Sequence, residues 1–194
     1  MKIISDIRLY KSSDIDNHMS FANKSLNIAV SRVVMKLREQ QFSLGEFDHL
    51  YVNFTTCIYE DKIELVDKVD SYHLWYRYCN IGVNKQDYEK LNIDTDYVLK
   101  KLKLVLMSVF SSNVNTEKII NTAFLEAQKG EEMLMHFKEK ITEKGAATIY
   151  LRLLDSGKYL PLLCVVDSNN NELLRENLPE TIDFNILGEI QLSG

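Results

Sequence analysis

Histidine and cysteine are the side chains of this 194-residue chain best suited to bind a transition metal or to act as a nucleophile. The histidines are scattered, without the H-x-x-x-H spacing that places two ligands on one helix face. The cysteines form no C-x-x-C pair, which argues against a zinc site and a disulfide framework. We therefore expect no metal, and thiols that are free and mostly buried. The residues concerned are His18, His49, His73 and His136, and Cys57, Cys79 and Cys164.

A cysteine–histidine nucleophile is the one catalytic arrangement that these residues allow. His73 and Cys79 lie six residues apart on one predicted strand, a separation of roughly 20 Å at ~3.3 Å per residue, which excludes a direct pair. Cys57, on a neighbouring predicted strand, could approach His73, and nearby carboxylates could complete a small enzyme with an unfamiliar site. Packing is the commoner role of two such residues in adjacent core strands, so we predict no catalytic residue.

Phosphate-binding loops are absent from the sequence, because neither G-x-x-x-x-G-K-[ST] nor G-x-G-x-x-G occurs. Two acidic segments, EDKIELVDKVD at residues 60–70 and NIDTDY at residues 92–97, lack the calcium-loop pattern. Such segments are typical of solvated loops or of helix starts. The sequence thus predicts no cofactor.

Residues 71–80, SYHLWYRYCN, contain four aromatic rings, a histidine and an arginine. The two-residue period of a strand divides them into two sides. We expect a core side with Tyr72, Leu74, Tyr76 and Tyr78, and a partly covered side with His73, Trp75, Arg77 and Cys79. A stacking platform for single-stranded nucleic acid needs a basic groove, but Arg77 is the only cation here and the preceding loop is acidic. We therefore predict no nucleic-acid partner.

The partly covered side is instead a candidate protein interface. Tryptophan and arginine often anchor protein–protein contacts, which makes His73, Trp75 and Arg77 candidate partner-binding residues. The structural alternative is that Trp75 packs beneath a helix and Arg77 pairs with an acidic neighbour.

The formal net charge of -5 arises at the C-terminal end. Residues 1–154 contain 21 acidic and 21 basic side chains, whereas residues 155–194 contain seven acidic and two basic ones. An anionic region repels phosphate backbones and attracts basic proteins, although it also serves solubility alone. The acidic candidates for partner binding are Asp167, Glu172, Glu176 and Glu180.

The apolar pattern predicts one α+β domain over residues 1–194, with lobes 1–130 and 131–194 as the alternative. We expect a mixed or antiparallel sheet, about three main helices and a C-terminal β-meander. Ser20 is the expected N-cap of the first helix, and DTDY begins a later one. Residues 133–142 fit either a strand or a helix, and we choose a strand. A final strand is expected within residues 182–192. No segment is long and apolar enough to span a membrane, and the N-terminus lacks a signal-peptide pattern, so we expect a cytoplasmic protein.

Three stretches of the sequence resemble an uncharacterised family of immunity proteins that accompany polymorphic toxins in low-GC Gram-positive bacteria. They are YVNFTTCIYED (residues 51–61), YHLWYRYCNIGVNKQDYEKLN (72–92) and LLDSGKYLPLLCVVDSNN (153–170). The resemblance implies a small cytoplasmic α+β protein that neutralises a toxin by binding it, without chemistry of its own.

Our leading hypothesis is accordingly a non-enzymatic protein-binding module, an immunity-type inhibitor whose partner is a protein, for example a basic toxin domain. The alternatives are a small enzyme with an unrecognised site and a homo-oligomeric assembly protein that uses Trp75 and Arg77. The sequence leaves the oligomeric state open.

Overall fold

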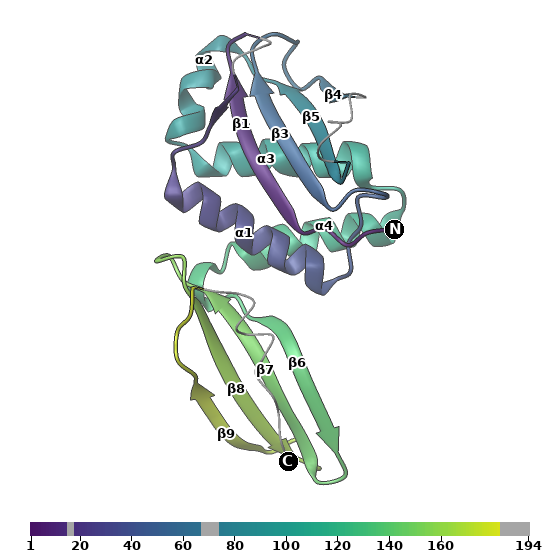
Figure 1. Cartoon of the computed structure of the whole chain (residues 1–194), viewed down its shortest axis with the longest axis vertical. Helices are drawn as coiled ribbons and strands as arrows, with labels where there is room; N and C mark the ends of the chain where they lie inside the picture. Colours follow the sequence, from purple (N-terminus) through teal and green to yellow (C-terminus); the bar gives the residue numbers. More distant parts are fainter. Residues whose placement is uncertain (15–17, 67–73, 183–194) are drawn as a thin grey trace. The chain divides into compact units, whose positions relative to one another are not determined.

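The computed structural model describes residues 1–14, 18–66 and 74–182 of the chain (Figure 1). The chain divides into two compact units, unit 1 (Met1–Glu126) and unit 2 (Ala127–Gly194). The described residues form two sheets and four α-helices, which confirms the predicted α+β class. The helix count differs slightly from the prediction, because α2 (Lys85–Tyr88) adds a helix of only four residues.

Unit 1 consists of a five-stranded mixed sheet and the helices that pack on it. The sheet has the order β2-β1-β3-β5-β4. Its three inner strands, β1, β3 and β5, run parallel, and the two edge strands pair antiparallel to their neighbours. The strands are β1 (Asp6–Ser12), β2 (Met19–Ser20), β3 (His49–Thr55), β4 (Ile63–Val66) and β5 (Tyr76–Gly82). Besides α2, the helical segments are α1 (Lys24–Glu39), η1 (Glu89–Asn92), α3 (Thr95–Val105), η2 (Leu106–Phe110) and α4 (Val114–Ala127).

Side-chain caps mark the first residues of two helices, α1 and α3. The Asn23 side chain accepts a hydrogen bond from the Leu26 backbone N–H at 3.0 Å, so α1 starts after Asn23. The predicted cap, Ser20, is wrong because this residue belongs to β2. In contrast, Asp94 of the DTDY segment accepts from the Tyr97 N–H at 2.9 Å and starts α3 as predicted.

The core of unit 1 lies between the sheet and these helices. The β3 side chains Leu50, Val52 and Phe54 are fully buried on this side, and the Phe54 ring meets Phe21 edge-on at 5.6 Å between centroids. The end of β5 packs equally closely against backbone: a Cβ on Gly82 would lie 1.8 Å from the carbonyl oxygen of Tyr59. Burial of this apolar face stabilises the sheet.

Unit 2 is an antiparallel meander, as the sequence predicts. Its strands follow one another in the sheet order β6-β7-β8-β9. Of the two structures that the sequence allows for residues 133–142, the strand is confirmed, because β6 occupies most of this segment. The final strand expected within residues 182–192 falls, apart from Ile182, outside the described residues. The elements are η3 (Gly130–Glu132), β6 (Met135–Thr142), β7 (Gly145–Leu153), β8 (Tyr159–Asp167) and β9 (Glu172–Asn177).

Candidate functional site

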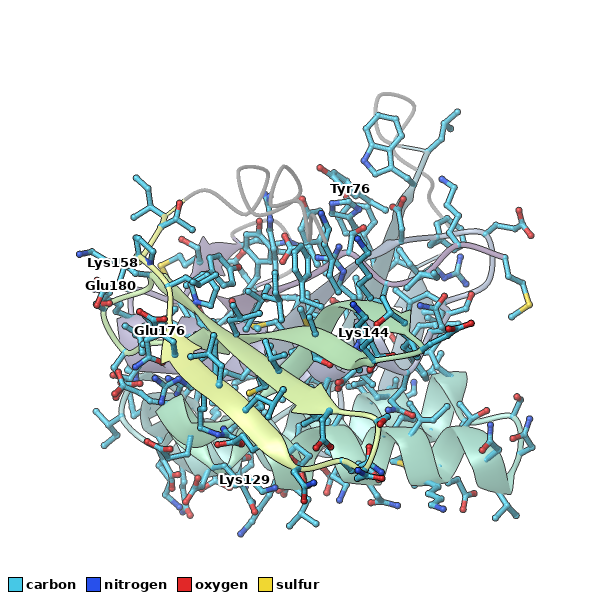
Figure 2. The ribbon with its side chains drawn as sticks, turned by 90° about the horizontal axis from the view of Figure 1, so that it is seen from below. Tyr76, Lys129, Lys144, Lys158, Glu176 and Glu180 are labelled. Carbon is cyan, nitrogen blue, oxygen red and sulfur yellow. The ribbon has the colours of Figure 1, made fainter. Side chains whose placement is uncertain are left out.

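The two faces of the unit 1 sheet differ in chemistry. Strand register aligns Leu9, Val52 and Cys79 on the face that the helices cover, which we call the apolar face. The alternate residues point the other way, and Figure 2 shows Tyr76 on the side of the sheet away from the helices. We call this second side the polar face. Its side chains come from the three parallel strands: Arg8, Tyr10, Tyr51, Asn53, Thr55, Tyr76, Tyr78 and Asn80.

Aromatic rings in mutual contact run across the polar face. The Trp75 and Tyr76 ring centroids lie 5.8 Å apart, and Tyr76 lies 4.7 Å from Tyr51. Tyr51 in turn meets Tyr78 at 5.0 Å and Tyr10 at 5.4 Å. These separations and the tilted or edge-on ring angles are those of favourable aromatic pairs. The result is one row of aromatic contacts, which we call the aromatic row.

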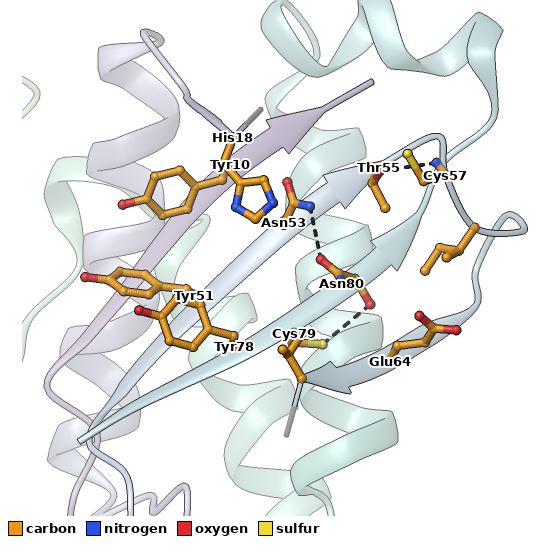
Figure 3. A pocket seen from close by; sticks show the side chains of 12 residues that line it. Tyr10, His18, Tyr51, Asn53, Thr55, Cys57, Glu64, Tyr78, Cys79 and Asn80 are labelled. Carbon is orange, nitrogen blue, oxygen red and sulfur yellow. Dashed lines mark hydrogen bonds between the residues drawn. The ribbon is translucent and has the colours of Figure 1, made fainter. Parts of the chain in front are cut away.

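The aromatic row leads into a cavity of about 690 Å³ on the polar face (Figure 3). This volume is in the range of small-molecule binding sites. The described lining residues are Tyr10, His18, Tyr51, Asn53, Thr55, Cys57, Ile58, Glu64, Val66, Tyr78, Cys79 and Asn80.

Two asparagines occupy the floor of the cavity. The Asn53 Nδ2 group donates to Ser12 Oγ and to Asn80 Oδ1, both at 3.0 Å. Asn53 is 7% exposed, and its Oδ1 atom is buried without a hydrogen-bond partner. An unsatisfied buried acceptor costs roughly 1–3 kcal/mol, and a ligand N–H that reached Oδ1 from the cavity would remove this cost.

Burial raises the pKa of two groups at the cavity, the Tyr51 hydroxyl and the Cys79 thiol. It raises the pKa of Tyr51, and a hydrogen bond with Tyr76 acts in the same direction. It also raises the pKa of the Cys79 thiol to about 12. Since the thiolate is the nucleophilic form of cysteine, Cys79 is poorly suited to covalent catalysis at neutral pH.

Trp75, one of the predicted partner contacts, lies just before β5 and is 40% exposed. Its carbonyl accepts from the backbone N–H groups of Asp48 and His49 at 3.2 and 3.3 Å, which fixes this residue against the start of β3. Arg77 places its guanidinium 5.2 Å from the centre of the Phe47 ring. His73 lies outside the described residues.

The sides predicted for residues 71–80 need correction. Cys79 was placed on the partly covered side, but it is buried and pairs in register with Val52 on the apolar face. Tyr76 and Tyr78 lie on the polar face, and Leu74 is 64% exposed where burial was expected. The error arises because β5 continues through Ile81 and Gly82, and the helices cover the side that carries Cys79 and Ile81.

The four acidic candidates belong to unit 2, and three have local partners. Asp167 accepts from the backbone N–H groups of Asn169 and Asn171, both at 2.8 Å, which with the Asn171 side chain lowers its pKa. Glu172 pairs with Arg175 at 2.9 Å. Glu180 pairs with Lys158 at 3.0 Å, and both residues are labelled in Figure 2. Glu176 is exposed on β9.

Cys57, the cysteine of the enzyme hypothesis, lies beyond the end of β3 and is exposed. Its sulfur contacts the Ser13 carbonyl oxygen at 3.6 Å. Because His73 lies outside the described residues, the proposed Cys57–His73 approach has no measured distance.

No protein-family model, curated protein or solved structure matches this chain. Within residues 1–14, 18–66 and 74–182, no three His, Cys, Asp or Glu side chains gather where they could hold a metal ion. The helices formed by these residues are all too short or too polar to cross a membrane. The functional argument therefore depends on the aromatic row and the cavity.

Neither the aromatic row nor the cavity was predicted from the sequence. Asn53 carried the only available signal, since asparagine is unfavourable inside a strand and stands between the apolar Val52 and Phe54. Tyr10 and Tyr51 gave none, because tyrosine in a strand fits a core as well as a binding site.

Proposed function

We propose that the chain is a non-enzymatic protein-binding module, and specifically an immunity-type inhibitor that neutralises a toxin in the cytoplasm by binding it. The observation that carries this proposal is the half-exposed Trp75 at the outer end of the aromatic row. Tryptophan and tyrosine supply large contact areas with few rotatable bonds, which is why they dominate interface hot spots.

The surroundings of Trp75 suit an interface anchor. Two backbone hydrogen bonds to its carbonyl fix the main chain, so little conformational entropy is lost when a partner contacts the ring. Leu74 adds an exposed apolar side chain next to it, and the nearby His49 and Asp48 side chains form a hydrogen bond of 2.7 Å that supplies a polar rim.

Charge supports a basic partner. The chain has a formal net charge of -5, and the excess of acidic residues follows residue 154. Such a charge accelerates the association of a basic protein and makes the association rate fall with added salt. Local ion pairs at Glu172 and Glu180 reduce the contribution of these two residues, which leaves Glu176 as the acidic candidate most available to a partner.

The direct test is protection of cells against a toxin domain encoded beside this gene. Co-expression of the chain should rescue growth, and the purified pair should bind. Trp75→Ala should weaken binding by about 2 kcal/mol or more, roughly thirtyfold, because it removes a central aromatic anchor. Tyr59→Ala is a matched control, since this aromatic side chain of unit 1 is 85% exposed and takes no part in the ring contacts that define the aromatic row. Absence of rescue, or equal binding by Trp75→Ala, would contradict the proposal.

The exposed Trp75 also fits a self-associating assembly protein. Size-exclusion chromatography separates the two functions. A wild-type oligomer that Trp75→Ala converts to a monomer would favour self-assembly, whereas a monomer in both cases favours a different protein as the partner.

A further inference from the structure

The cavity on the polar face is a site that the protein-binding proposal does not use. We propose that it binds an organic cation carrying N–H donors, a guanidinium or an alkylammonium group. The inference begins with Asn53, a residue of the cavity lining whose buried Oδ1 atom lacks a hydrogen-bond partner. A ligand N–H that reaches this atom would remove the cost of leaving it unsatisfied.

The charges around the cavity select a cation. The described lining residues include the carboxylate of Glu64 and neither lysine nor arginine. Lys62 pairs with Glu64 through Oε1 at 2.6 Å, and this lysine is outside the lining. The second carboxylate oxygen of Glu64 can therefore accept from a ligand, whereas the described lining offers an anionic ligand no lysine or arginine. Glu64 is also the register partner of Asn80, which places the carboxylate and the amide pair on neighbouring strands (Figure 3).

The tyrosines provide the remaining part of a cation site. The cavity is lined by Tyr10, Tyr51 and Tyr78, whose ring faces attract cations. Tyr51 already has the Arg8 guanidinium 5.7 Å from its ring centre. Arg8 is bound to Asp6 at 2.8 Å and does not line the cavity, so its charge is offset outside the site.

Two pairs of small molecules test this proposal, and each pair differs by one charge at nearly constant shape. Butylguanidinium and butylurea represent a free ligand. The amides of Nα-acetylarginine and Nα-acetylcitrulline represent a side chain presented by another protein. Each is titrated at millimolar concentration into the 15N-labelled full chain, and the side-chain amide signals of Asn53 and Asn80 report binding at the cavity.

We expect at least one cation to bind about tenfold more tightly than its neutral counterpart and to shift the Asn53 amide signals. Tighter binding by butylguanidinium identifies a free cation as the ligand. Charge selectivity by the arginine derivative alone identifies a protein side chain. Equal affinities within both pairs, shifts confined to residues outside the cavity, or no saturable binding would overturn the proposal.

Two variants identify the groups responsible. Glu64→Gln preserves shape and should weaken cation binding about fivefold, whereas Glu46→Gln, an exposed residue outside the cavity, should leave it unchanged. Asn53→Leu should weaken it about tenfold. Unchanged affinity in Glu64→Gln would overturn the assignment even if Asn53→Leu failed to fold. Trp75→Ala should retain cation binding, so failure of this site and failure of the protein-binding proposal give different results.

Discussion

The apolar and polar faces of the unit 1 sheet are formed by the same strands but differ in the polarity of their buried side chains. Both are built from the same three parallel strands, and β3 is buried on both sides over most of its length. On the apolar face, Val52 and Phe54 are fully buried, and their side chains have no polar atom that needs a partner. On the polar face, Asn53 is buried between them with an unsatisfied oxygen. Burial of side chains thus stabilises the fold on the apolar face. On the polar face it leaves the Asn53 oxygen without a hydrogen bond, which costs free energy that a bound ligand would recover.

The largest effect that we expect comes from the apolar face. Phe54→Ala should lower the free energy of unfolding by about 3–5 kcal/mol, because it leaves a cavity beneath the helices where Phe54 is fully buried against Phe21. Urea denaturation followed by circular dichroism measures this loss. A loss below about 1 kcal/mol would show that this face does not provide the main stabilisation.

Asn53→Leu, one residue away on the polar face, should have a much smaller effect. The variant loses the hydrogen bonds to Ser12 and Asn80 but also removes the unsatisfied Oδ1 atom. The free energy of unfolding should therefore fall by only about 1 kcal/mol. If Asn53→Leu were as destabilising as Phe54→Ala in the same denaturation experiment, Asn53 would have a structural role that the hydrogen bonds do not reveal.

Tyr51→Phe should have a smaller effect still. It keeps the ring contacts of the aromatic row and removes only the hydroxyl that is hydrogen-bonded to Tyr76. We expect a loss of about 0.5 kcal/mol, at the lower end for a neutral hydrogen bond. Thermal unfolding by calorimetry is sensitive enough to measure it. A loss above about 1.5 kcal/mol would indicate that the hydroxyl, and not the ring, holds the row together.

Local sequence patterns were sufficient for most of the fold. The two-residue alternation and turns of the last third predicted the meander of unit 2, and Asp94 identified the start of α3 because capping depends on a few neighbouring residues. Ser20 failed as a cap because Asn23 supplies a competing acceptor three residues later.

The site was harder to predict because its chemistry depends on which face the helices cover. Residues 71–80 alternate tyrosines with Trp75, Arg77 and Cys79, and both sides are amphipathic. Only the register of β5 with β3 settles that Cys79 shares the buried side of Val52, whereas Tyr78 lies on the side of Tyr51. The meeting of Asn53 with Asn80 is likewise a result of register between strands 27 residues apart.

The most direct test of the division between the two faces is the butylguanidinium affinity of Phe54→Leu measured beside that of Glu64→Gln. Phe54→Leu should destabilise the fold by about 1 kcal/mol and leave the affinity unchanged, because the residue lies on the apolar face. Glu64→Gln should weaken binding about fivefold with the free energy of unfolding within about 0.5 kcal/mol of wild type. Two results would contradict the division between the faces. They are a reduced affinity of Phe54→Leu under conditions in which the variant is fully folded, and an unchanged affinity of Glu64→Gln.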